Sequence, residues 1–189
     1  HPLILRTLTL NCLTVHYREL WEELYTPAFR EDAWTKDDSR LRGDFFRNLT
    51  PRWQRNVALR YDYERRQALV EIDVLTAMAL GLTLDELITL YRIQFPVMQE
   101  YERDTWYDRD GRIVWTNSKG LPGVRFQERS EWEAAQRLKD GESGSRTVAD
   151  DTRPGGPVAR EIRYTAPFAR ADRVADYTAA WQAFTERGL

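Results

Sequence analysis

The chain has 189 residues, 42% of them hydrophobic and 12% aromatic, and its 28 basic residues nearly balance 30 acidic ones. A chain of this length can bury an ordinary core, and its 23 Trp, Tyr and Phe residues exclude a disordered protein. The longest uncharged stretch, residues 74–84, is far shorter than the roughly 20 residues that a membrane helix needs. The only cysteine, Cys12, excludes an internal disulfide and a cysteine-rich zinc site.

These features predict a cytoplasmic globular domain without a membrane segment. The chain begins with His1-Pro2 and has no signal-peptide pattern, so we interpret it as a piece of a longer protein. Charge is uneven along it. Residues 61–110 carry five basic and eleven acidic side chains, whereas residues 111–170 carry eleven basic and eight acidic ones. The later segment is therefore the better candidate for contact with a polyanion.

The first apolar pattern indicates an N-terminal helix. Its members recur at spacings of three and four: Leu10, Leu13, Tyr17, Leu20 and Leu24. The polar residues 26–44 that follow predict a loop with one short helix.

Two helices in succession are predicted in the middle of the chain. Asp62 can cap the first of them, and Gly81 suits the left-handed position after its end. Thr83 and Glu86 have the spacing of a capping box, so a second helix starts there and ends near Pro96. A third helix is expected from Pro96 to about residue 105.

The last third has mixed character. Asp110-Gly111 predicts a hairpin turn between strands near residues 106–107 and 113–115. Ser130 and Glu133 indicate a capped helix, residues 140–157 a mobile loop, residues 162–166 a strand, and residues 174–188 a final helix. We therefore predict a mainly helical α+β fold: a helical region over 1–106 and a small α+β region over 107–189 packed on it, together forming one compact domain.

One motif in the helical region has the spacing of a DNA-binding motif. Ala77, Gly81 and Leu87 have the offsets of a helix-turn-helix. The recognition helix would then begin with Asp85 and Glu86, at the end that faces DNA phosphates, where positive charge is expected. An ordinary antiparallel helix pair explains the same spacing.

No complete active site is visible in the sequence. Glycine-rich nucleotide motifs are missing, and His1 and His16 are the only histidines, so zinc and Cys–His chemistry lack partners. Asp104, Asp108 and Lys119 resemble part of a metal-dependent nuclease site, but Asn117 stands where the acid two residues before the lysine belongs. We expect no bound metal and no cofactor in this chain.

A binding surface is the remaining possibility. Arginine and asparagine can make bidentate contacts to base edges, and tryptophan can stack on a base. The candidate residues for nucleic-acid binding are Arg112, Trp115, Asn117, Lys119, Arg125, Arg160 and Arg163. A solvated charged face explains the same residues without a ligand.

Six runs of sequence share their wording with one family of proteins: residues 65–75, 91–97, 101–108, 111–114, 117–121 and 150–157. Together they resemble the C-terminal region of the class I S-adenosylmethionine-dependent, adenine-specific DNA methyltransferases of fused restriction–modification or phage-defence systems.

The resemblance implies an enzyme that methylates adenine N6 in duplex DNA after flipping the base. The glycine-rich cofactor turn and the Asn-Pro-Pro-aromatic motif of its catalytic domain are not in this sequence. The family therefore implies a non-catalytic target-recognition or DNA-clamping part, with S-adenosylmethionine bound elsewhere in the parent enzyme. Two alternatives stay open: a protein-docking module of a phage-defence complex, and a degenerate metal-dependent nuclease.

Overall fold

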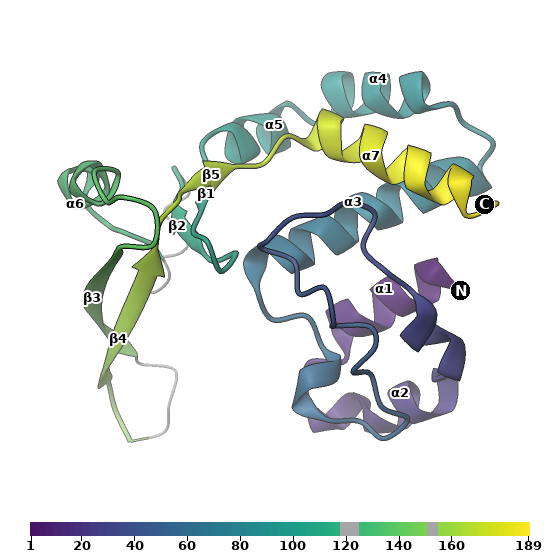
Figure 1. Cartoon of the computed structure of the whole chain (residues 1–189), viewed down its shortest axis with the longest axis horizontal. Coiled ribbons are helices and arrows are strands. Elements are labelled where there is room, and N and C mark those ends of the chain that lie inside the picture. Colours follow the sequence, from purple (N-terminus) through teal and green to yellow (C-terminus); the bar gives the residue numbers. More distant parts are fainter. Residues whose placement is uncertain (118–124, 151–154) are drawn as a thin grey trace. The chain divides into compact units, whose positions relative to one another are not determined.

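The protein is described here by a computed structural model of residues 1–117, 125–150 and 155–189, which has a mainly helical α+β fold (Figure 1). The chain forms two compact units: residues 1–96 with 172–189, and residues 97–171. The predicted division at residue 106 differs from this arrangement. The C-terminal helix belongs to the first unit, because its buried face packs against helices of the central region.

The first unit begins with α1 (Pro2–Asn11), a 3₁₀ turn (Val15–Tyr17) and α2 (Arg18–Leu24). The single helix predicted over residues 10–24 is wrong, since the backbone becomes extended at Thr14. Leu20 and Leu24 are exposed, whereas Trp21 is fully buried and donates its indole N–H to the Thr50 carbonyl at 2.9 Å. Burying one Trp removes more apolar surface from water than burying a leucine would.

The polar residues 26–44 are irregular with one short 3₁₀ helix at Pro27–Glu31, as predicted, and a further 3₁₀ turn follows at Arg55–Val57. This irregular passage is fastened to α1 and α3 by the fully buried Arg6. The Arg6 guanidinium donates to Asp32 at 2.5 Å and to Glu71 at 2.6 Å. Burial alone would lower the pKa of Arg6, but the two carboxylates overcome this effect and raise it.

The central helices are α3 (Asp62–Ala79) and α4 (Leu84–Gln94), followed at the end of the chain by α7 (Arg173–Glu186). Thr83 and Glu86 form the predicted capping box, and Gly81, with φ of 73°, ends the preceding turn. The predicted cap at Asp62 is wrong. Asp62 is the first residue of α3, and Tyr61 occupies the N-cap position without a side-chain cap bond.

One hydrophobic cluster joins these three helices, and α7 lies alongside α3 (Figure 1). It contains Ala77 of α3, Leu87 and Tyr91 of α4, and Tyr177 and Phe184 of α7. The spacing that suggested a helix-turn-helix therefore serves the packing of α3 against α4.

The second unit contains most of α5 (Pro96–Arg103), a small antiparallel sheet and α6 (Arg129–Ala135). The strand order is β2 (Ile113–Trp115), β1 (Trp106–Tyr107), β5 (Ala169–Arg170), so the predicted hairpin is confirmed. The helix predicted around Trp132 is present, but its capping box is formed by Glu128 and Glu131, not by Ser130 and Glu133.

A separate two-stranded ribbon pairs β3 (Ser143–Asp150) with β4 (Val158–Thr165) (Figure 1). The strand predicted over residues 162–166 is confirmed as part of β4, whereas β3 lies where the mobile loop was expected. The loop prediction is therefore wrong for residues 143–150. The alternation of Gly144, Arg146 and Val148 with small polar residues suits a strand with one covered face. The many Gly, Ser and Asp residues in this segment favoured a loop prediction, although its side chains alternate with the period of two of a strand.

Candidate nucleic-acid interface

The hairpin turn before β2 is fastened to β4 by one carboxylate. Asp108 is fully buried, and its Oδ1 accepts the backbone N–H groups of Asp110 at 3.0 Å and Arg112 at 2.8 Å. Its Oδ2 accepts the N–H of Thr165 at 3.4 Å, and the N–H of Arg109 donates to the Thr165 carbonyl at 2.9 Å. The turn and the base of the ribbon therefore form one hydrogen-bonded structure.

Burial raises the pKa of Asp108, and the nearby Asp110 adds to this effect, while N–H groups of Arg112 and Thr165 oppose it. The folded protein thus holds this proton to a higher pH than the unfolded chain, whose carboxyl titrates near 3.8. The contribution of Asp108 to stability is accordingly largest below the unfolded value and falls as pH rises through the folded one.

We expect Asp108→Asn to remove this contribution because the amide does not titrate. In urea unfolding measured between about pH 3 and 7, the difference in unfolding free energy between variant and parent should shift in favour of the variant as pH rises. Exposed Asp140 provides the control, and Asp140→Asn should leave the profile unchanged. A pH-independent difference for Asp108→Asn would contradict the raised pKa.

Three arginines gather at this junction. Arg112 is half-buried, and its Nη1 donates to the Arg163 carbonyl at 2.9 Å. Arg163 is exposed on β4, and Arg109 is exposed in the turn. The sequence reasoning included Arg112 and Arg163 but missed Arg109, although its place between two predicted strands already put it in the turn.

The fold brings Trp115 and Arg125 together, as the predicted binding surface requires. The two side chains, however, contact each other and the aromatic core instead of facing a ligand. The guanidinium carbon of Arg125 lies 5.2 Å from the centre of the Trp115 ring, which stacks on Trp132 at 6.2 Å with an interplanar angle of 4°. Trp132 also contacts Trp106, over which Arg170 lies at 5.0 Å. This Arg–Trp ladder is a packed structure, and Trp115 is not an open platform for a base.

The two predicted arginines of β4 are separated. Side chains alternate along a strand, so Arg160 and Arg163, three positions apart, point to opposite faces of the ribbon. Arg160 shares its face with Ile162 and with Tyr164, whose pKa burial raises to about 12. The predicted cluster is thus divided between two faces.

Arg146 lies on the same face as Arg160. One of its guanidinium nitrogens donates to the Arg125 carbonyl, and its Nε is buried without a hydrogen-bond partner among the described residues. This inner face is buried at Val148 and at Tyr164, which belongs to the same hydrophobic cluster as Trp132, whereas Arg160 farther along β4 is exposed.

The acidic residues of the nuclease hypothesis form hydrogen bonds within the protein. Asn117 donates its amide to Asp104, the Asp108 oxygens accept backbone N–H groups, and Lys119 lies outside the described residues. Within residues 1–117, 125–150 and 155–189, no three His, Cys, Asp or Glu side chains are grouped to hold a metal ion.

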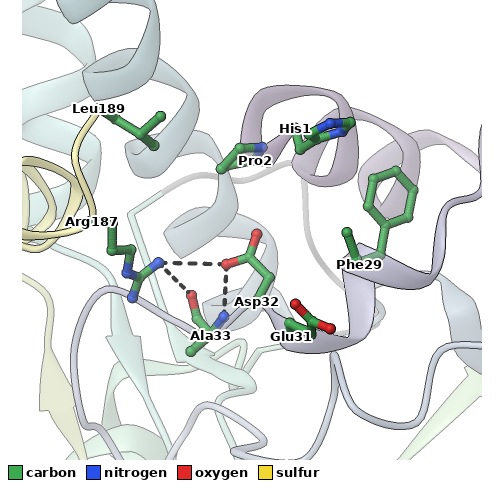
Figure 2. A pocket seen from close by; sticks show the side chains of 9 residues that line it. His1, Pro2, Phe29, Glu31, Asp32, Ala33, Arg187 and Leu189 are labelled. Atoms are coloured by element: carbon green, nitrogen blue, oxygen red, sulfur yellow. Dashed lines mark hydrogen bonds and ion pairs between the residues drawn. The ribbon is translucent and has the colours of Figure 1, made fainter.

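A cavity of about 380 Å³ lies in the first unit, and none of the predicted binding residues lines it (Figure 2). The charged side chains of its lining are Asp32, Arg187 and the exposed Glu31. Arg187 donates to the Ala33 carbonyl at 3.1 Å and the Trp34 carbonyl at 2.9 Å, while Asp32 binds the buried Arg6. These groups are committed to holding the irregular passage in place.

No protein-family model, curated protein or solved structure matches this chain. Within the part of the chain that the structure describes, every helix is too short or too polar to cross a membrane.

Proposed function

We propose that this chain is a non-catalytic, DNA-contacting part of a cytoplasmic adenine-specific DNA methyltransferase of the restriction–modification type. In this proposal, S-adenosylmethionine and the methyl transfer belong to the catalytic domain of the parent enzyme. The family resemblance supports the methyltransferase assignment. The observation that carries the DNA contact is the group of Arg109, Arg112 and Arg163. The Arg109 N–H donates to the Thr165 carbonyl, and the Arg112 guanidinium donates to the Arg163 carbonyl.

The chemistry of this group suits a phosphate backbone. Arginine binds phosphate oxygens through a planar fork of N–H donors, and a fixed backbone lowers the entropy lost on binding. Asp108, which joins the turn to β4, is buried and already accepts three N–H groups, so it does not compete at the surface. Asp110, next to Arg109 in the turn, is exposed and lowers the net positive charge of the group. Phosphate contacts from Arg109 and Arg112 give a salt-dependence slope of about −1.8 in B-DNA, and Arg163 is left to contact a base edge.

Retention of the 189-residue chain on duplex DNA, measured across a salt series, tests this proposal. We expect the affinity to fall with a slope of about −2, Arg109→Ala to reduce the slope by about 0.9, and Arg163→Ala to weaken binding with little change in the slope. Arg129, which pairs with Glu133 on α6, is the matched control, and Arg129→Ala should leave the slope unchanged. Absent retention at low salt would refute the DNA contact.

The protein-docking alternative has one observation in its favour. On α4, Leu90 and Ile93 are 43% and 66% exposed and lie outside the buried stripe formed by Leu87 and Tyr91. Exposed apolar side chains in an acidic helical region suit a protein partner better than DNA. Unaltered DNA retention in all the arginine variants, or none in the parent chain, would favour this second function.

A further inference from the structure

The outer face of the β3–β4 ribbon carries polar groups from Arg163 onward, away from the hairpin turn. The strand period puts Glu161 and Arg163 on the outer face, opposite Thr147 and Ser145 of the neighbouring strand. All four side chains are exposed. The other outer positions carry small side chains, namely Ser143, Ala149, Ala159 and Thr165. Only Glu161 and Arg163 therefore extend far from the ribbon.

The ribbon is held rigidly at one end. The hydroxyls of Ser143 and Thr165 lie 2.9 Å apart across the strands, and the Thr165 N–H donates to Asp108. Just beyond, Ala166 donates to the Glu142 carbonyl at 2.9 Å. The outer face therefore has a defined position relative to Arg109 and Arg112, the two phosphate-binding candidates of the turn.

The dimensions of the ribbon match a DNA groove. Each strand has eight residues, which corresponds to a length of about 27 Å, and paired strands lie about 4.8 Å apart. The major groove is about 12 Å wide and admits a two-stranded ribbon. Glu161 and Arg163 are two residues apart and thus about 6.8 Å apart along the strand, a distance close to two base-pair steps of about 3.4 Å.

We infer that the outer face of the β3–β4 ribbon lies in the major groove of duplex DNA, where Arg163 contacts guanine and Glu161 contacts cytosine. Arginine pairs with guanine O6 and N7, and glutamate accepts from cytosine N4. Arg109 and Arg112 then lie where they can hold the adjacent phosphates. Glu161 repels the backbone electrostatically, so it selects against non-specific contact. This inference rests on the proposed function.

Site-directed cross-linking tests the groove assignment. The native thiol of Cys12 is fully buried, so an introduced cysteine can be the reactive one. The variants are Ser145→Cys on the outer face and Ser130→Cys on exposed α6 as control. The probes are 30-base-pair duplexes with a disulfide-activated tether on cytosine N4 in the major groove or on guanine N2 in the minor groove.

We expect Ser145→Cys to cross-link to the major-groove probe roughly tenfold more than to the minor-groove probe. Its yield with the major-groove probe should also exceed that of Ser130→Cys roughly tenfold. Equal yields, or a preference for the minor groove, would overturn the inference while leaving the proposed DNA contact intact. If the parent chain does not bind DNA, the proposed function fails and the inference fails with it.

Selection of preferred sequences from a random duplex pool tests the base contacts. The parent chain should enrich guanine at one position, and Arg163→Ala should reduce that preference by roughly tenfold, the loss of one bidentate contact. Glu161→Gln should relax a cytosine preference two steps away and increase binding to unselected DNA. Enrichment that is identical for parent and variants would refute the assignment of these two residues.

Discussion

Replacing Glu71 by alanine is expected to lower the free energy of unfolding of the first unit by about 3–5 kcal/mol, the usual cost of breaking a buried ion pair from one side. Glu71 is fully buried and accepts from Arg6 Nε at 2.6 Å. It also accepts the backbone N–H and the hydroxyl of Thr35, at 3.0 and 2.7 Å. The truncation leaves these donors without their acceptor in a dry environment.

Urea unfolding followed by far-UV circular dichroism measures this effect. Glu71→Gln keeps an acceptor for Thr35 and should cost less than the alanine variant. Glu23 on α2 is exposed, so Glu23→Ala is a matched control that should change stability by less than about 0.5 kcal/mol. A loss for Glu71→Ala no larger than that of the control would show that Arg6 does not depend on this partner.

Trp132→Ala should have the largest effect in the second unit, a loss of about 3–5 kcal/mol from the cavity and the lost burial. Trp132 is 5% exposed and contacts the rings of Trp106, Trp115, Phe126 and Phe168. The helix that carries it has only seven residues and cannot be stable without this packing. The hydrophobic support beneath the ribbon would be lost with it.

Amide hydrogen exchange separates the two units in this experiment. Protection in β3, β4 and α6 should fall in Trp132→Ala, while protection in α3 and α7 should stay as in the parent chain. Glu133→Ala, one residue along on the exposed side of α6, is the control and should leave both regions unchanged. Retained protection of the ribbon in Trp132→Ala would show that it does not depend on the aromatic cluster.

The sequence predicted best where local chemistry decides the structure. The capping box at Thr83 and Glu86, the glycine after α3 and the Asp110-Gly111 turn each satisfy backbone groups within a few residues, and all three are present. The class of fold followed from them. The prediction of a single N-terminal helix was wrong because it followed the leucine spacing. The buried residue is Trp21, whose partners are residues 29 and 50, and the leucine spacing does not indicate these contacts.

The binding surface shows the same division. Residue types in the basic segment were enough to select Arg112 and Arg163, because charge and hydrogen-bonding capacity belong to the side chain alone. Only the folded chain shows three further relations. Trp115 is covered by Trp132 and Arg125, and Arg160 faces away from Arg163. Asp108 joins the turn to β4. These relations join residues far apart in sequence, and strand pairing and burial, not local preference, set them.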